Sequence, residues 1–117
     1  MRAKDILGRR GEEAAAAHVT GLGWAVLDRN WRCAEGEIDI VARDGSDLVV
    51  CEVKTRSGTG YGTPAEAVTP AKAARLRRLA SRWLAAHGVG HASARIDVIG
   101  LVADGPRFTI DHLKGVC

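Results

Sequence analysis

The chain has 117 residues, of which 46% are hydrophobic and 26% are charged. This length is close to the commonest domain size, so we expect one domain over residues 1–117, and the composition excludes a disordered chain of low hydrophobicity. A formal net charge of +3 and a pI near 9.0 suit a polyanionic partner without identifying one.

The cysteines and the apolar segments indicate the cellular compartment. Cys33, Cys51 and Cys117 are odd in number and widely spaced, so they predict neither a disulfide framework nor a zinc site. No signal-peptide pattern follows Met1, and no segment approaches the ~18 apolar residues that a membrane helix needs. We therefore expect a cytoplasmic protein with no membrane partner. The four histidines are scattered along the sequence, and none is assigned as a ligand.

The first half of the chain predicts one helix and three strands. Strong helix formers run from Arg9 to Val19 and end near Gly21. A strand is expected over residues 24–28, running toward Trp31. Two further β-rich runs, residues 36–42 and 48–54, flank an Asp-Gly turn signal and predict a β-hairpin.

The second half predicts a loop, a helix and two strands. Glycines and a proline make residues 55–68 a flexible connection, and Thr69 followed by Pro70 is typical of a helix start. That helix should run to His87 with an apolar face formed by Leu76, Leu79, Ala80, Trp83 and Leu84. Residues 95–102 and 108–112 predict the last strands. The order α-β-β-β-α-β-β indicates an α/β domain with a mixed central sheet of four to five strands flanked by helices.

The predicted hairpin gathers charged side chains on one face. If Gly45 and Ser46 form a two-residue turn, Asp39 lies opposite Glu52, whereas a turn one residue earlier slides the pairing by two and keeps the same faces. A bulged turn would change this arrangement. The charged face is expected to hold Glu37, Asp39, Glu52 and Lys54. The opposite, apolar face is expected to hold Ile38, Ile40, Ala42, Val49, Cys51 and Val53.

Two carboxylates on opposed strand positions need a compensating partner. Their Cβ atoms would be ~5 Å apart, and two unit charges at that distance repel by roughly 3 kcal/mol at an effective dielectric near 20. Asp39 and Glu52 could both reach one Mg²⁺ ion, which prefers oxygen ligands. Lys54, two residues along the same face, could then stabilise charge developing on a phosphate. The alternative is a solvated hairpin face laced by an ion pair, but the apolar flanking residues favour a buried site.

The residues of the hairpin resemble a known signature. Asp39 followed by Glu52-Val53-Lys54 resembles the Asp…Glu-x-Lys pattern of the restriction-endonuclease-like, or PD-(D/E)xK, superfamily. Longer motifs along nearly the whole chain are similar to the YraN-like family of uncharacterised bacterial proteins, which is predicted to share its fold with archaeal Holliday-junction resolvases. These motifs are Gly11-Glu12, Asn30-Trp31-Arg32, Gly36-Glu37-Ile38-Asp39, Glu52-Val53-Lys54-Thr55-Arg56, Pro64-Ala65-Glu66-Ala67-Val68, Lys72 and Arg95-Ile96-Asp97-Val98.

The resemblance implies a restriction-endonuclease-like fold and a site for Mg²⁺ or Mn²⁺. It implies that Asp39 and Glu52 are metal ligands, that the main-chain carbonyl of Val53 is a further ligand, and that Lys54 is the catalytic lysine. Glu12 would be the additional acidic residue that resolvase-like members bring from the first helix. The alternative for Glu12, an ordinary partner of the helix dipole, is equally favoured.

The second predicted helix carries basic residues and no acidic one. Arg75, Arg78 and Arg82 form one stripe along it, which could neutralise phosphates. The alternative is a solvated face whose arginine stems cover apolar neighbours. Arg56 and Lys72 are the stronger individual candidates for nucleic-acid binding, because they lie beside the predicted site and just after the loop.

Together these patterns predict a metal-dependent nuclease that acts on DNA rather than RNA, with branched or structured DNA as the substrate implied by the resemblance. The alternative is a non-catalytic or partner-dependent nucleic-acid-binding module with a nuclease-like fold. A glycosidase-like carboxylate pair is disfavoured, because it gives no role to Lys54 or to the basic helix. A homodimer would suit a symmetric junction, by analogy alone.

Overall fold

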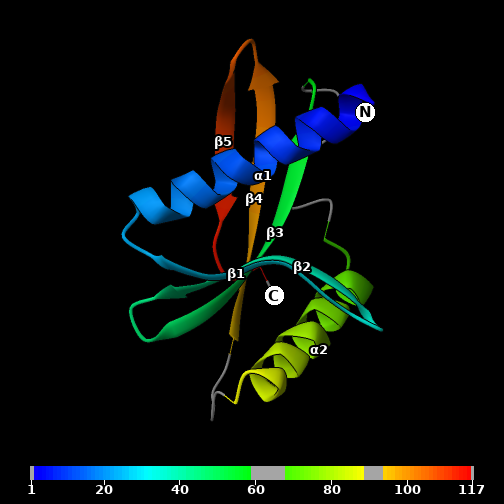
Figure 1. Cartoon of the computed structure of the whole chain (residues 1–117), viewed down its shortest axis with the longest axis vertical. Coiled ribbons are helices and arrows are strands. Elements are labelled where there is room, and N and C mark those ends of the chain that lie inside the picture. The colour runs from blue at the N-terminus through cyan, green and yellow to red at the C-terminus, as the bar shows by residue number, and fades with distance from the viewer. Residues whose placement is uncertain (1, 59–67, 89–93, 117) are drawn as a thin grey trace.

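A computed structural model of the chain describes residues 2–58, 68–88 and 94–116 (Figure 1). Two helices, α1 (Ala3–Gly21) and α2 (Pro70–Ala86), pack on a five-stranded sheet. The strands are β1 (Ala25–Cys33), β2 (Gly36–Asp44), β3 (Asp47–Arg56), β4 (Ala94–Asp104) and β5 (Arg107–Leu113). The predicted element order is confirmed, although α1 begins at Ala3 rather than at Arg9. Most of the predicted loop over residues 55–68 lies outside the described residues.

The sheet has the strand order β1-β2-β3-β4-β5, and only the β3–β4 pair is parallel. A parallel pair needs a crossover connection, and α2 lies in that connection. Between β2 and β3, Ile40 pairs with Cys51 and Asp44 pairs with Asp47, so Gly45 and Ser46 form a two-residue turn. The positive φ of Gly45 (61°) suits such a turn. The first of the two predicted hairpin registers is therefore the observed one.

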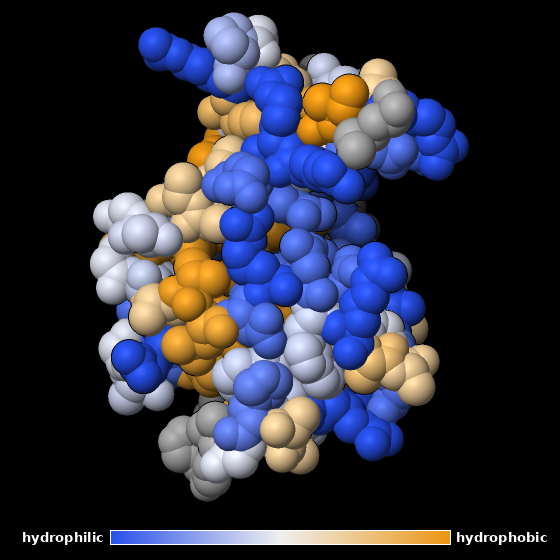
Figure 2. Space-filling view, in the orientation of Figure 1, coloured by the Kyte–Doolittle hydropathy of each residue, from blue (hydrophilic) through white to orange (hydrophobic). Residues whose placement is uncertain are grey.

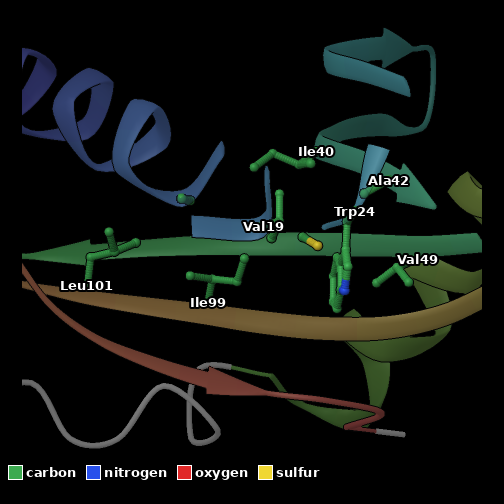
Figure 3. Packing of buried hydrophobic residues seen from close by; sticks show 9 residues of the cluster. Val19, Trp24, Ile40, Ala42, Val49, Ile99 and Leu101 are labelled. Carbon is green, nitrogen blue, oxygen red and sulfur yellow. The ribbon is translucent and has the colours of Figure 1, made fainter. Parts of the chain in front are cut away.

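The two helices cover opposite faces of the sheet, as the alternating side chains of β3 demonstrate. Val49 and Cys51 belong to the cluster under α1, whereas Leu48 and Val50 belong to the cluster under α2. Figure 3 shows the first cluster, with Val19, Trp24, Ile40, Ala42, Val49, Ile99 and Leu101 labelled. The second cluster contains Ile38, Val41, Leu48, Val50, Leu76, Leu79, Ala80, Trp83 and Ile96.

The start of α2 is fixed by the predicted cap. The Thr69 side chain accepts a hydrogen bond from the Lys72 backbone N–H (3.1 Å), and Pro70 occupies the first helical turn. A threonine cap typically stabilises a helix by ~1 kcal/mol. Leu76, Leu79 and neighbouring apolar residues of α2 face the sheet, and Lys72 lies at the end of the helix near β3.

A buried carboxylate ties the C-terminal segment to β4. Asp97 is fully buried and accepts hydrogen bonds from Arg95 (2.9 and 3.1 Å), from His112 Nε2 (2.9 Å) and from the Gly115 backbone N–H (3.0 Å). Burial alone would raise the pKa of Asp97, but these donors lower it. Asp97 therefore remains ionised and holds β5 and the following residues against β4.

The outer surface is mostly polar. Hydrophilic side chains predominate on the face in Figure 2, where hydrophobic ones form smaller patches. Within the described residues, the exposed large hydrophobic side chains are Ile6, Leu22 and Leu27. Neither α1 nor α2 is long and apolar enough to cross a bilayer.

Gly11 allows α1 to lie close to β3. A Cβ atom at this position would overlap the Thr55 side chain, approaching its Cγ2 atom to 2.7 Å and its Cβ atom to 2.9 Å. Glycine inside a helix costs roughly 1 kcal/mol relative to alanine, so its presence here reflects the close approach. That approach also brings the neighbouring Glu12 toward β3.

We therefore expect Gly11→Ala to destabilise the protein by about 1–3 kcal/mol, the usual cost of overpacking. Urea denaturation would measure this change. Gly8→Ala in the same helix is the matched control, because a Cβ at Gly8 meets no atom within 4 Å and should be neutral or stabilising. Equal effects of the two substitutions would contradict the close-packing explanation.

Candidate functional site

The hydrogen-bond ladder between β2 and β3 ends one pair before the predicted carboxylates. Ile40 and Cys51 form its last pair, so Asp39 and Glu52 follow where the two strands separate. On the other side of β2, Asn30 lies between the pairs Arg29–Ile40 and Trp31–Ile38, and it has a positive φ of 53°. Asparagine tolerates this conformation better than most residues. The backbone is therefore irregular on both sides of Asp39.

One predicted side-chain face is wrong because of this irregularity. Ile38 and Ile40 were expected to share the apolar face, but Ile38 packs in the cluster under α2 and Ile40 in the cluster under α1. Strict alternation would have placed them together. The change of face occurs at Asp39, which is thereby held at the border between the two helical layers.

The Asp39 carboxylate replaces the missing ladder partner of β3. Its Oδ2 atom accepts a hydrogen bond from the Val53 backbone N–H (2.8 Å). In a paired strand the N–H and C=O of one residue point to the same side, so the Val53 carbonyl also faces Asp39. This arrangement brings together the oxygen atoms that the resemblance implies as metal ligands: those of Asp39, Glu52 and the Val53 main chain.

Glu52 is held by two lysines from different elements. Its Oε1 atom lies 3.3 Å from Lys54 Nζ of β3 and 3.0 Å from Lys72 Nζ of α2. The Glu52 side chain is only 12% exposed, so these contacts are shielded from water. The sequence placed Lys54 beside Glu52 but assigned Lys72 only to nucleic-acid binding. No local pattern links Lys72 to Glu52, because the contact depends on the packing of α2 against β3.

The surroundings of Asp39 raise the pKa of its carboxyl group. The pKa of Asp39 is raised from 3.8 to about 7, mainly by burial, and the hydrogen bond from the Val53 N–H opposes this rise only in part. The carboxylates of Glu52, Glu12 and Glu37 contribute smaller parts of the same rise. Glu12 of α1 is therefore close enough to influence the charge of Asp39. An ionised Asp39 in this setting would be stabilised by a cation.

The surroundings of Lys54 lower the pKa of its ammonium group. Burial lowers its pKa, and a hydrogen bond with Lys72 lowers it further, while the Glu52 carboxylate raises it. Lys54 and Lys72 share one oxygen of Glu52, so the single negative charge of this carboxylate balances only one of the two ammonium groups. Lys54 and Lys72 therefore present positive charge, and a hydrogen-bond donor, beside the Asp39 and Glu52 carboxylates.

The residues present fit a magnesium-type site. Mg²⁺ is usually bound through one or two carboxylates, with waters and substrate phosphates completing its shell. The hydrogen bond and ion pairs described above engage Oδ2 of Asp39 and Oε1 of Glu52, so the second oxygen of each carboxylate can bind an ion. No group of three His, Cys, Asp or Glu side chains within residues 2–58, 68–88 and 94–116 could enclose a metal ion alone. A bound ion would therefore depend on the Val53 carbonyl, water or substrate as well.

An acidic residue forms ion pairs with two arginines of the predicted basic stripe. Glu35, in the turn between β1 and β2, lies 2.6 Å from Arg82 Nε and 3.7 Å from Arg78 Nε. Figure 1 shows this turn reaching toward α2. Arg75 lies beside the same turn, where its Cδ atom would be 4.0 Å from a Cβ on Gly36. Sequence reasoning missed Glu35, because the counter-charge comes from a different element.

Arg56 lies at the end of β3, half-buried, where its Nη1 atom donates to the Thr55 carbonyl (3.5 Å). The structure thus brings Asp39, Glu52, Val53, Lys54 and Lys72 together, with Glu12 nearby. The arginines of α2 form a neighbouring surface rather than part of this cluster.

Comparison with known proteins places this whole cluster inside one family match. A model of the uncharacterised protein family UPF0102 matches residues 11–101. A UPF0102 protein of Frankia alni is 60% identical, over 98% of this chain and 97% of its own. A UPF0102 protein of Arthrobacter sp. (strain FB24) is 56% identical over 99% of both chains, and one of Nocardioides sp. is 56% identical over 97% of this chain and 92% of its own.

The raised pKa of Asp39 leads to a prediction about stability. A carboxyl group whose pKa is higher in the folded state destabilises the fold as pH rises from its unfolded value toward its folded value, here from 3.8 to about 7. Once Asp39 is fully ionised, this effect lowers the free energy of unfolding by about 4 kcal/mol. Asp39→Asn should therefore stabilise metal-free protein, with a gain that grows between about pH 4 and pH 7 and stays constant above.

Thermal unfolding in EDTA at pH 5 and pH 8 would measure this effect. Asp5→Asn is the control, because Asp5 lies in an exposed surface pair with Arg2 and should show no such trend. A gain from Asp39→Asn that is equal at both pH values would contradict the raised pKa of Asp39.

Proposed function

The chain belongs to the uncharacterised protein family UPF0102, and on that premise we propose that it is a metal-dependent nuclease that hydrolyses phosphodiester bonds in DNA. The family membership agrees with the resemblance found in the sequence, to an uncharacterised bacterial family. The observation that carries the proposal is the meeting of Asp39 and Glu52 with Lys54 and Lys72 where the β2–β3 ladder ends.

In this proposal each residue of the cluster has its own role in metal binding or catalysis. Asp39, Glu52 and the Val53 carbonyl would hold Mg²⁺ or Mn²⁺, and the hydrogen bond from Val53 orients the Asp39 carboxylate. The bound ion would polarise the scissile phosphate and help to activate water. Lys72 and Lys54 restrict Glu52 to one position, as groups around a metal ligand commonly do. Lys54 would also stabilise negative charge that develops on the phosphate.

The surroundings of the site support a polyanionic substrate. Arg56 follows Lys54 on β3, and Arg75, Arg78 and Arg82 extend positive charge along α2. These residues could contact phosphates on either side of the scissile bond. Structured or branched DNA remains the proposed substrate by resemblance, with a homodimer as the form that would suit a symmetric junction. In this proposal the protein acts in the cytoplasm, where DNA and magnesium are both available.

We expect Mg²⁺- or Mn²⁺-dependent cleavage by the wild-type protein, and its loss in Asp39→Asn and in Lys54→Ala. The first change removes a metal ligand, and the second removes a positive charge beside the phosphate. The assay would use single-stranded, duplex, flapped and four-way-junction DNA. The substrate that is cut would also define the shape that is recognised.

Glu12→Gln and Glu13→Gln form a matched pair for the same assay. Glu12 influences the charge of Asp39, so Glu12→Gln should reduce cleavage. Glu13 is exposed and pairs with Arg29 (2.9 Å), so Glu13→Gln should leave cleavage unchanged. Circular dichroism would verify that each variant is folded. Undiminished cleavage by purified Asp39→Asn or Lys54→Ala protein would refute the proposed site.

A second candidate function is a nucleic-acid-binding module without turnover, and the basic surface of α2 favours it. In that case DNA binding should survive Asp39→Asn and depend on Lys72 and the arginine stripe. Metal-dependent cutting separates the two functions, because only the nuclease requires the carboxylates for its activity.

The Glu35 contacts give a prediction for either function. Glu35→Gln should release Arg78 and Arg82 for phosphate contacts, tighten DNA binding severalfold and steepen the salt dependence of log K by up to ~2. Glu13→Gln is the control, because it removes the same charge from a pair outside α2. Fluorescence anisotropy at several salt concentrations would measure both. Equal changes in the two variants would show that only net charge matters.

A further inference from the structure

Two histidines that lie far apart in the sequence meet between α1 and β5. His18 Nε2 and His112 Nδ1 are 3.0 Å apart, and the ring centroids are 5.1 Å apart with an angle of 69° between the ring planes. The rings therefore approach nitrogen to nitrogen and not face to face. Two imidazole nitrogens that converge in this way can bind one metal ion between them.

A buried carboxylate fixes the orientation of one ring. Because an ionised carboxylate only accepts hydrogen bonds, His112 Nε2 carries a proton and donates it to Asp97 Oδ2 (2.9 Å). In neutral His112 the lone pair is then on Nδ1, the atom that faces His18. A carboxylate behind a histidine is the usual support of a metal-binding imidazole, since it fixes the tautomer and makes the free nitrogen more basic.

The pair is open to solvent on one side. A surface hollow of about 720 Å³ is lined by His18, Leu22, His112, Leu113, Lys114 and Val116. A metal ion between the two nitrogens could therefore take further ligands from the hollow. Water or a small external ligand would complete its coordination.

We propose that His18 and His112 form a metal site, separate from the carboxylate cluster, for a divalent transition-metal ion that prefers imidazole, such as Zn²⁺, Ni²⁺ or Cu²⁺. Within residues 2–58, 68–88 and 94–116 no third side chain joins the two histidines as a ligand, so the site has two protein ligands and open positions. Mg²⁺, which prefers oxygen ligands, is not expected here.

Metal binding would require the two rings to separate slightly and to turn until their nitrogen lone pairs meet at the ion, because the hydrogen-bonded nitrogens now point at each other. Two nitrogens bound to tetrahedral Zn²⁺ at ~2.0–2.1 Å lie ~3.3 Å apart, compared with 3.0 Å here. The proton that His18 Nε2 donates to His112 would move to His18 Nδ1, which leaves both facing nitrogens free to bind metal without net loss of a proton. The ion would then link the C-terminal half of α1 to β5.

Nearby charges act in both directions. Asp97 supplies negative charge behind His112, although Arg95 shares it. The Lys114 ammonium lies over the Trp24 ring, 5.5 Å from its centroid, and is close enough to repel positive charge at His18. Removing the Lys114 charge should therefore strengthen metal binding.

Calorimetric titration with Zn²⁺ would test the site, in an Asp39→Asn background that weakens the carboxylate site as a competitor. We expect one Zn²⁺ per chain and a rise in Tm on binding, because a ligand that binds only the folded state stabilises it. His18→Gln should weaken Zn²⁺ binding at least tenfold and abolish the rise in Tm. Lys114→Gln should tighten binding.

His87→Gln is the matched control, because His87 lies at the end of α2, where its Nδ1 atom contacts the Trp83 carbonyl (2.8 Å). His112→Gln should also lose binding, but it removes a donor from buried Asp97, so the half-buried His18 position decides the result. Absence of saturable Zn²⁺ binding would overturn the proposal. Equal affinity of His18→Gln and the parent protein, or equal losses in His18→Gln and His87→Gln, would also overturn it.

Discussion

The end of the β2–β3 ladder at Ile40 and Cys51 is the constraint on which the candidate site depends. A buried backbone N–H without a partner costs ~1–3 kcal/mol, and beyond this pair the Val53 N–H is satisfied by the Asp39 side chain instead of by β2 backbone. This hydrogen bond holds a carboxylate between the strands, away from most water. Burial, together with the neighbouring carboxylates, then raises the pKa of Asp39 to about 7, and the proposed metal ion would stabilise its ionised form.

The rest of the cluster is assembled around that carboxylate from three elements. Lys54 comes from β3 and Lys72 from α2, and both contact Glu52, while Glu12 approaches from α1 because Gly11 allows close packing on Thr55. Each helix therefore covers one face of the sheet and also delivers one charged group to the point where β2 and β3 separate. Stability and the proposed chemistry share the same contacts, so a change in helix packing would alter the electrostatics of the site.

The second proposed site depends on the opposite half of α1. His18 follows Glu12 by about two turns of helix and meets His112 of β5, which is backed by the fully buried Asp97. In both places a carboxylate with fixed hydrogen-bond donors orients the neighbouring groups. The difference lies in the ligand atoms, oxygen around Asp39 and imidazole nitrogen at His18, which select different classes of metal ion.

The sequence by itself determined the element order, the hairpin register through its Asp-Gly turn, the start of α2 through Thr69 and Pro70, and the grouping of Asp39, Glu52 and Lys54. These features rest on local spacing within a strand, a turn or a helix end. Only the tertiary structure decided that Ile38 changes face, that Lys72 contacts Glu52, that Glu35 pairs with Arg82, and that His18 meets His112. Each of these depends on a backbone irregularity or on packing between elements distant in the sequence, and side-chain periodicity carries no information about either.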